Sequence, residues 1–169
     1  DLGGGTFDIS ILKIHNGIFE VLSTHGDTYL GGDDFDQLIV RKWVKEHNIS
    51  EGRLRNDKEL MQTLRLKAET AKIHLSAKDV FIDHIGDIQL QVAVSEFNKL
   101  IQPYITKTLD ACERALKDAG LQKQDINEVV MVGGSTRTPI IKKAVSNFFG
   151  LSLHDTLNPD EVVALGAAV

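Results

Sequence analysis

A run of three glycines, Gly3 to Gly5, lies in the opening stretch DLGGGTFD and constrains the fold more than any other part of the sequence. Glycine lacks a Cβ and loses the most backbone entropy on folding, so a run of three indicates a turn with positive φ or a group packed against the backbone. A tight turn needs only one or two glycines. The neighbouring Asp1, Thr6 and Asp8 supply carboxylates and a hydroxyl beside backbone N–H groups, which suits a phosphate and its Mg²⁺.

The residues that follow the glycine run predict a β-hairpin. Phe7, Ile9 and Ile11 alternate with other residues, and the pair Asn16-Gly17 is a favoured two-residue hairpin turn before the apolar run resumes. A P-loop would need a Gly-Lys-Ser/Thr ending and a following helix, and a dinucleotide fingerprint needs G-x-G-x-x-G before a helix. Neither pattern is present, so the glycine run is the entrance to a hairpin.

The rest of the sequence alternates between strand and helix patterns. A second hairpin is expected over 80–94, and EVVMV (128–132) is typical of a buried strand. Five helices are expected. The first follows a cap at Asp33 or Asp34, the second covers 57–76, and the third runs from a cap at Ser95 to Gly120 with a kink at Pro103. The fourth has Thr138 as its cap and Pro139 in first position, and the fifth starts at Pro159. Hairpins followed by strand–helix alternation predict the α/β class.

The helix predicted over 57–76 has two distinct faces. At about 100° per residue its apolar side chains share one stripe, while Arg65, Glu69, Lys72 and Ser76 share the opposite face. The predicted apolar stripe consists of Leu60, Leu64, Ala68, Ala71 and Leu75. One face is therefore core and the other is free to bind, although the spacing of the charged residues equally fits a solvated ladder of ion pairs.

The stretch VGGSTRTP places Gly133 and Gly134 between a predicted strand and a predicted helix. The first N–H groups of a helix are unsatisfied and the helix dipole is positive there, so this turn can bind an anion. Arg137 has a flat guanidinium that can stack on a base. A plain strand-to-helix connection explains the same residues. The stretch LGGDDFD (30–36) likewise fits a turn and a helix cap, and its aspartate spacing does not fit a calcium loop.

Composition limits the classes of partner. The net charge of −5 argues against a nucleic-acid or anionic-membrane surface, and no apolar run is long enough to span a bilayer. The single Cys112 rules out an intramolecular disulfide framework and indicates a reducing compartment. The six histidines lack the spacing of a zinc site. We therefore expect no nucleic acid, no membrane and no histidine-bound metal.

Several motifs occur together in a recognisable order. They are DLGGGTFD, LGGDDFD, the face with Glu69, Lys72 and Ser76, VGGSTR, and NPDEVVALGAAV. With this order and these separations the chain resembles the nucleotide-binding domain of the seventy-kilodalton heat-shock (DnaK-type) chaperones, from the first residue to the last. The resemblance implies an actin-like ATPase fold, which is ribonuclease H-like, with only its second lobe present. Because the first residue lies inside a motif, we expect a piece excised from a longer protein.

The resemblance also implies subdomains and a site. A core subdomain, IIA, is expected at 1–30 and about 106–169, and an inserted subdomain, IIB, at about 31–105. The implied ligand is ATP or ADP with Mg²⁺, and K⁺ is an additional candidate ion. The residues implied as catalytic are Asp1, Thr6 and Asp8, with Asp1 facing the metal through water and Asp8 in the carboxylate set that orients hydrolysis. Gly4, Gly5 and Thr6 are implied to hold the β- and γ-phosphates.

The resemblance implies nucleoside contacts from several segments. Gly32 is implied to lie near the phosphates and ribose, and Asp160 to support the ribose pocket. An adenosine-binding helix is implied to carry Glu69, Lys72 and Ser76, and the other side of the base is implied to be closed by Gly134, Ser135, Thr136 and Arg137. One position departs from the family. Lys72 is followed by Ile73 where the family usually has arginine, so one of the two guanidiniums that commonly sandwich the adenine is replaced by an apolar side chain. We therefore expect weaker nucleotide binding, by about 0.5–2 kcal/mol.

A second departure is the short turn HIGDIQ (84–89). Together with Ile73 and the run RALKDAG, it resembles the HscA branch, whose members serve iron–sulphur cluster assembly. The branch implies a chaperone that couples ATP hydrolysis to client binding and release in the bacterial cytoplasm or an organelle matrix. It also implies an HscB-like J-domain co-chaperone and a client such as an iron–sulphur scaffold.

The family's first phosphate loop, catalytic lysine and metal-orienting glutamate are expected upstream, so the chain alone should be inactive. A general folding chaperone of the DnaK type, a sugar kinase of the same superfold and a pure interaction module stay open as alternatives.

Overall fold

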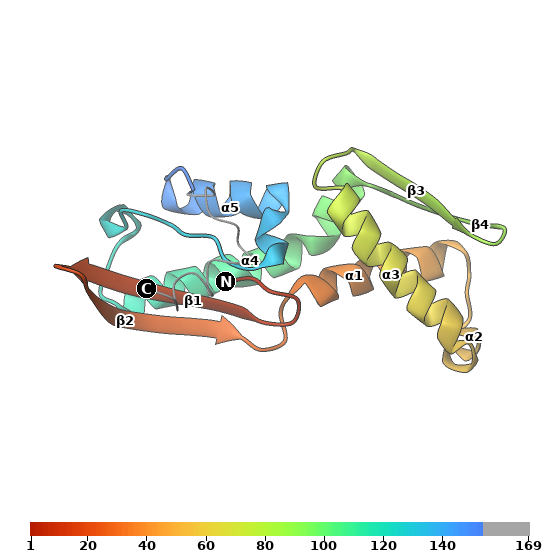
Figure 1. The fold of residues 1–169 in the computed structure, drawn as a ribbon, viewed down its shortest axis with the longest axis horizontal. Coiled ribbons are helices and arrows are strands. Elements are labelled where there is room, and N and C mark those ends of the chain that lie inside the picture. The colour runs from red at the N-terminus through yellow and green to blue at the C-terminus, as the bar shows by residue number, and fades with distance from the viewer. Residues whose placement is uncertain (154–169) are drawn as a thin grey trace. The chain divides into compact units, whose positions relative to one another are not determined.

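The computed structural model describes residues 1–153, so the helix predicted from Pro159 lies outside the described residues (Figure 1). The described residues divide into two compact units. Unit 1 combines residues 1–32 with the part of the chain from Pro103 onward, and unit 2 is Asp33–Gln102. Helices and strands are both present, as the α/β prediction requires. None of the helices within residues 1–153 has the length and apolarity that a membrane span needs.

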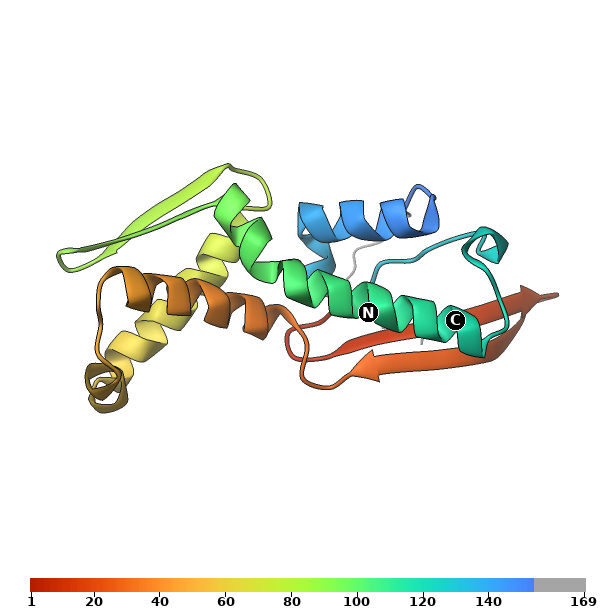
Figure 2. The same ribbon diagram turned by 180° about the vertical axis from the view of Figure 1, so that it is seen from behind.

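Unit 1 contains the first predicted hairpin. Strands β1 (Phe7–His15) and β2 (Ile18–Asp27) pair antiparallel (Figure 2). Their register shifts between Ile11 and Leu12. The turn between them is Asn16-Gly17, with φ of 51° and 76°. Both residues take positive φ, which is the requirement of a two-residue turn that matches the twist of the strands. The hairpin prediction is therefore confirmed at its turn.

The core of unit 1 lies against one face of this hairpin. Ile11 packs with Ala115 and Leu116 of helix α4 (Val94–Asp118), together with partly buried side chains that include Phe148 and Phe149 at the end of helix α5 (Pro139–Phe149). Cys112 of α4 is also buried, at 4% exposure. The apolar side chains exposed on the same hairpin are Leu12, Ile14, Ile18, Phe19 and Val21.

One prediction about unit 1 is wrong, and so is the predicted start of helix α4, which lies in unit 2. The segment 128–132 forms no strand longer than a single bridged residue, and Val130 is 48% exposed. A buried strand needs hydrogen-bonded neighbours and cover on both faces, whereas the backbone bond seen at this segment's end runs from Leu2 N to Val132 O, 2.7 Å. Helix α4 begins at Val94, ahead of the cap predicted at Ser95, because the Glu96 carboxylate accepts the Ala93 N–H at 2.9 Å. The helix continues through Pro103.

Unit 2 contains helices α1 (Gly32–Glu46), α2 (Glu51–Asn56) and α3 (Lys58–His74) and strands β3 (Val80–Ile85) and β4 (Ile88–Ala93). It also includes the first part of α4, up to Gln102. The two strands form the second predicted hairpin, with Gly86 at φ 56° in the turn. Helix α1 starts at Gly32, so Asp33 and Asp34 lie in its first turn and do not cap it. There their carboxylates still interact favourably with the helix dipole.

Helix α3 confirms the predicted apolar stripe. Asp57 caps the helix by accepting the Leu60 N–H at 2.9 Å. The buried residues of the stripe are Leu60, Leu64, Ala68, Ala71 and, at the C-cap, Leu75. Helix α2 was not predicted. None of its residues is buried, so its sequence lacks the apolar periodicity that indicates a helix.

Trp43 of α1 is the largest fully buried side chain of the described residues. Its Nε1–H donates to the Gln91 carbonyl at 2.8 Å, and its ring stacks on Phe81 with centroids 6.2 Å apart. We expect Trp43→Ala to lower the free energy of unfolding by about 3–5 kcal/mol, because it leaves a cavity and removes the indole N–H that donates to the Gln91 carbonyl. Urea unfolding followed by circular dichroism measures this. Trp43→Phe keeps most of the ring and should cost clearly less, and equal costs for the two variants would contradict the assignment.

Candidate functional site

The glycine run at 3–5 forms a tight loop that is packed against Gly31 and Gly32 of the second glycine motif. The Gly3 N–H donates to Thr6 O at 3.0 Å, and the Gly32 N–H donates to Gly3 O at 2.9 Å. A Cβ on Gly31 would lie 2.3 Å from the carbonyl oxygen of Gly4, far inside van der Waals contact. Gly31 is therefore needed because the backbone of the first glycine loop occupies the space of its side chain.

The third glycine motif is bonded to the same loop. Ser135 donates twice to it, from its backbone N–H to Leu2 O at 3.2 Å and from its Oγ to Gly3 O at 2.9 Å. Gly133 has φ of 90°, and a Cβ there would lie 2.4 Å from Leu2 O. All these residues belong to unit 1. Three glycine motifs that are far apart in the sequence thus meet at one place.

The outer part of the loop is accessible. Gly4, Gly5 and Thr6 are exposed, and a Cβ on Gly5 would meet nothing within 4 Å. Asp1 and Asp8 are also exposed, and their main chains are joined by a bond from Asp8 N to Asp1 O at 2.9 Å. The structure therefore brings together backbone N–H groups, a hydroxyl and two carboxylates, the set that a phosphate group and its metal require.

The acidic side chains of the described residues also determine which kind of metal site is possible. Within residues 1–153 no three His, Cys, Asp or Glu side chains are grouped closely enough to hold an ion by themselves. Magnesium in phosphate sites keeps several waters and is bound through one or two carboxylates plus the phosphates. The pair Asp1 and Asp8 beside an open glycine loop fits that requirement.

Residues 134–137 form a 3₁₀ turn ahead of helix α5. The helix begins at Pro139, with Thr138 at its N-cap position, as predicted. Ser135 and Thr136 are buried, and the Thr136 hydroxyl donates to Gly133 O at 2.6 Å. Arg137 is exposed. The Thr136 hydroxyl therefore closes the turn, and the Ser135 hydroxyl ties the turn to the glycine loop. The predictions missed the role of Ser135 because it depends on a contact between residues far apart in the sequence.

Helix α3 in unit 2 carries the other predicted site residues. Glu69 is exposed, Ile73 is 64% exposed, and the half-buried Ser76 donates from Oγ to Lys72 O at 3.3 Å. The prediction that Lys72 lies on an open face is wrong. Its ammonium forms an ion pair with Asp36 of α1 at 2.8 Å, and each side chain is only 14% exposed. The periodicity of α3 alone cannot show that a carboxylate from another helix covers it.

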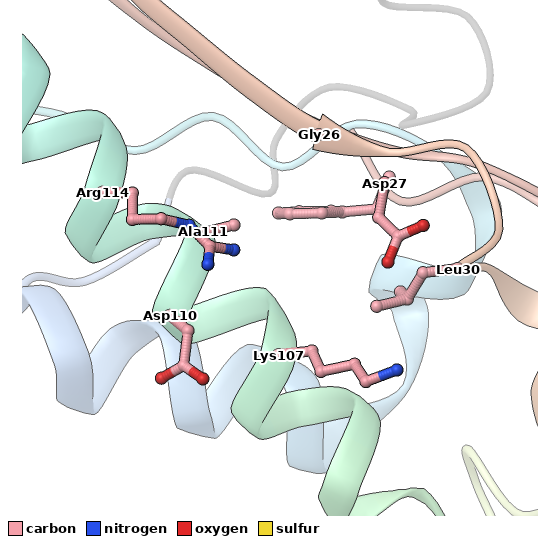
Figure 3. Close-up of a pocket in the computed structure, with 8 residues that line it drawn as sticks. Gly26, Asp27, Leu30, Lys107, Asp110, Ala111 and Arg114 are labelled. Atoms are coloured by element: carbon pink, nitrogen blue, oxygen red, sulfur yellow. The ribbon is translucent and has the colours of Figure 1, made fainter.

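A cavity of about 270 Å³ in unit 1 is lined by none of the predicted site residues within 1–153. Three charged side chains of α4, Lys107, Asp110 and Arg114, line it together with Asp27 at the end of β2 (Figure 3). Both signs of charge are present, so the cavity has no net preference for an anion or a cation.

Comparison with known proteins agrees with this geometry. A family model described as "Hsp70 protein" matches residues 1–169. The chain is 50% identical to the chaperone protein HscA of Klebsiella pneumoniae (strain 342) and 47% identical to that of Cronobacter sakazakii (strain ATCC BAA-894). It is 48% identical to the HscA homolog of Aliivibrio fischeri (strain MJ11). Each match covers 100% of this chain and 27% of the relative, so the chain spans about a quarter of the length of these proteins. The chain belongs to the Hsp70 family and has that family's actin-like ATPase fold, with mixed helices and strands.

Proposed function

We propose that this chain is the second lobe of the nucleotide-binding domain of an ATP-hydrolysing chaperone of the DnaK/HscA type. The convergence of three glycine motifs around an exposed loop at Gly4, Gly5 and Thr6 is the observation that carries the proposal. Membership of the Hsp70 family supports it. Units 1 and 2 are proposed as subdomains IIA and IIB of the ribonuclease H-like lobe, since their boundaries fall close to the predicted ones.

In the proposed phosphate site, the N–H groups of Gly4 and Gly5 and the hydroxyl of Thr6 bind the β- and γ-phosphates. Exposed backbone N–H groups in a tight turn form a concavity suited to an anion. Gly32 acts through the loop, because its own N–H is bonded to Gly3 O. Asp1 holds Mg²⁺ through water, and Asp8 orients the water for hydrolysis. When bound, the Mg²⁺ ion neutralises charge on the phosphates. A K⁺ ion stays an additional candidate at this site.

The proposed nucleoside contacts come from Glu69, Lys72, Ile73 and Ser76 of α3 and from residues 134–137 of unit 1. Since Ser135 and Thr136 are buried and direct their hydroxyls to backbone carbonyls, they contribute by fixing the turn, and Arg137 provides the stacking surface. Asp160, the remaining predicted contact, lies outside the described residues.

The proposal is tested on the full-length protein. ATP and ADP with Mg²⁺ should raise its melting temperature, and a J-domain co-chaperone should stimulate its ATP hydrolysis. The absence of any nucleotide-dependent stabilisation would leave the interaction module as the better explanation. ADP release that depends on a sugar and ignores the J-domain protein would identify a kinase of the same superfold.

Within this class we propose the HscA branch. The relatives at 47–50% identity are named HscA, and Ile73 and the short β3–β4 turn fit that branch. The proposed partners are an HscB-like J-domain co-chaperone and an iron–sulphur scaffold as client, in the bacterial cytoplasm or an organelle matrix. Stimulation by an HscB-type protein that exceeds stimulation by a general DnaJ-type protein supports the branch. The reverse order would favour a general folding chaperone.

Replacing Ile73 by arginine should tighten nucleotide binding. Ile73 is 64% exposed on α3, so a longer side chain fits there without repacking the core. A guanidinium stacked on the adenine should contribute about 0.5–2 kcal/mol, or about twofold to thirtyfold in the dissociation constant of ADP. Calorimetric titration of the full-length protein measures this. Leu66→Arg is the matched control, because Leu66 is 57% exposed on the same helix and is not a proposed contact. Equal changes in the ADP dissociation constant for the two variants would contradict the prediction.

A further inference from the structure

The ion pair between Lys72 and Asp36 differs from the other ion pairs of the described residues. Lys72 Nζ lies 2.8 Å from Asp36 Oδ2, and both side chains are 14% exposed. In every other pair within residues 1–153 at least one partner is 38% exposed or more. Among these ion pairs, Lys72–Asp36 is thus the one in which both side chains are most shielded from water.

The carboxylate of this pair is also incompletely satisfied. Asp36 Oδ1 is buried and has no hydrogen-bond partner, and it is the only side-chain atom of the described residues in that condition. Burial raises the pKa of Asp36, and the hydrogen bond from Lys72 opposes this shift without overcoming it. A buried carboxylate that lacks donors is costly, and a buried ion pair contributes little to stability compared with apolar residues of similar volume. Folding stability is therefore a poor explanation for this pair.

The effect of Asp36 on Lys72 provides a better explanation for the ion pair. A lysine ammonium sits on a flexible four-carbon stem and carries three donors, so it loses much rotamer freedom when a ligand fixes it. Asp36 takes one of these donors and comes from a different helix, α1. It therefore holds the ammonium at a defined place on α3 before any ligand arrives, and a side chain that is already fixed costs less to use in binding.

We propose that Asp36 is a positioning residue for nucleoside recognition: its carboxylate fixes the ammonium of Lys72, which α3 presents to the nucleotide. The inference rests on the proposed function, in which Lys72 contacts adenosine. Asp36 itself acts through Lys72 and has no direct contact with the nucleotide in this proposal.

The test measures ADP binding to the full-length protein by calorimetric titration. Asp36→Asn should raise the dissociation constant about threefold to tenfold, the cost of immobilising one long side chain on binding. Lys72→Met should raise it about tenfold or more, because a charged donor is lost. The double variant should bind no more weakly than Lys72→Met alone, since a positioning residue has nothing left to position. Additive losses in the double variant would overturn the proposal.

A matched control separates this effect from general loss of a surface charge. Glu46→Gln removes one of the two carboxylate partners of Lys42, a lysine of α1 whose side chain is 13% exposed and whose Nζ lies 2.5 Å from Glu46 Oε1. It should leave the ADP dissociation constant unchanged. If Asp36→Asn does not fold, Asp36→Glu keeps the charge but moves the carboxylate by one methylene, and it should still weaken binding at least about threefold. An unchanged dissociation constant in a folded Asp36 variant would overturn the proposal.

The outcomes also distinguish this inference from the function on which it rests. If Lys72→Met binds ADP as tightly as the parent protein, the proposed nucleoside role of Lys72 fails, and the inference fails with it. If Lys72→Met is weakened and Asp36→Asn is not, the proposed function stands and only the positioning role is lost.

Discussion

Replacing Gly31 by alanine is expected to weaken ATP binding by the full-length protein about a hundredfold, the loss when two backbone N–H groups no longer donate to a charged phosphate, at about 1.5 kcal/mol each. The added Cβ would lie 2.3 Å from Gly4 O, 2.5 Å from Gly4 C and 2.6 Å from Gly5 N. All three are backbone atoms, so none can rotate away, and the loop itself must move. Because Gly4 and Gly5 are the proposed phosphate ligands, displacement of this loop should act directly on binding.

Equilibrium titration with ATP and Mg²⁺ measures the loss, and a melting curve measures the accompanying strain of about 1–3 kcal/mol. Gly52→Ala is the matched control. It makes the same chemical change in helix α2, where a Cβ would meet nothing within 4 Å, so it should leave binding unchanged and stabilise the protein slightly. ATP affinity within about threefold of the parent in Gly31→Ala would mean that the glycine loop does not bind the phosphates.

Residues 1–169 expressed alone are expected to hydrolyse ATP no faster than background. Phosphoryl transfer depends on charges placed on all sides of the γ-phosphate, and one such charge contributes about 10³–10⁵ to the rate. In the proposed site this chain supplies backbone N–H groups, the Thr6 hydroxyl and the carboxylates of Asp1 and Asp8. The resemblance assigns the catalytic lysine and the first phosphate loop to sequence upstream, so part of the required charge should be missing.

A coupled assay of ADP release measures this, with the full-length protein as the positive reference. The same chain carrying Gly31→Ala, purified in parallel, reports any contaminating ATPase. Equal low rates in the two preparations fit the expectation. Turnover that is present in the parent chain and removed by Gly31→Ala would show that these residues catalyse hydrolysis without the upstream part.

Local signals were sufficient to predict much of the fold. The Asn16-Gly17 turn depends on the backbone preferences of two neighbouring residues, and it was found where the sequence placed it. The apolar stripe of α3 depends on periodicity within one helix, and its members are buried. Thr138 and Pro139 mark the start of α5 for the same reason. Each of these features is determined within a few turns or a few residues of the chain.

Features that depend on distant residues were missed. The segment 128–132 has the composition of a buried strand, but strand formation needs partners, and composition does not supply them. Asp36 covers Lys72 from a different helix, and the space at Gly31 is occupied by Gly4. The sequence did indicate that glycines at 3–5, 31–32 and 133–134 were important. It could not show that they are important to each other.

The buried Cys112 has a practical consequence for labelling. It is the single cysteine of the 169 residues, it is 4% exposed, and burial raises the pKa of its thiol to about 11. The thiolate is the reactive form of cysteine, so this side chain is both covered and protonated at neutral pH. A cysteine introduced at an exposed site such as Lys117 would then be the one reactive thiol of this chain. Fluorescent or spin probes can therefore be attached at chosen positions without first replacing the native residue.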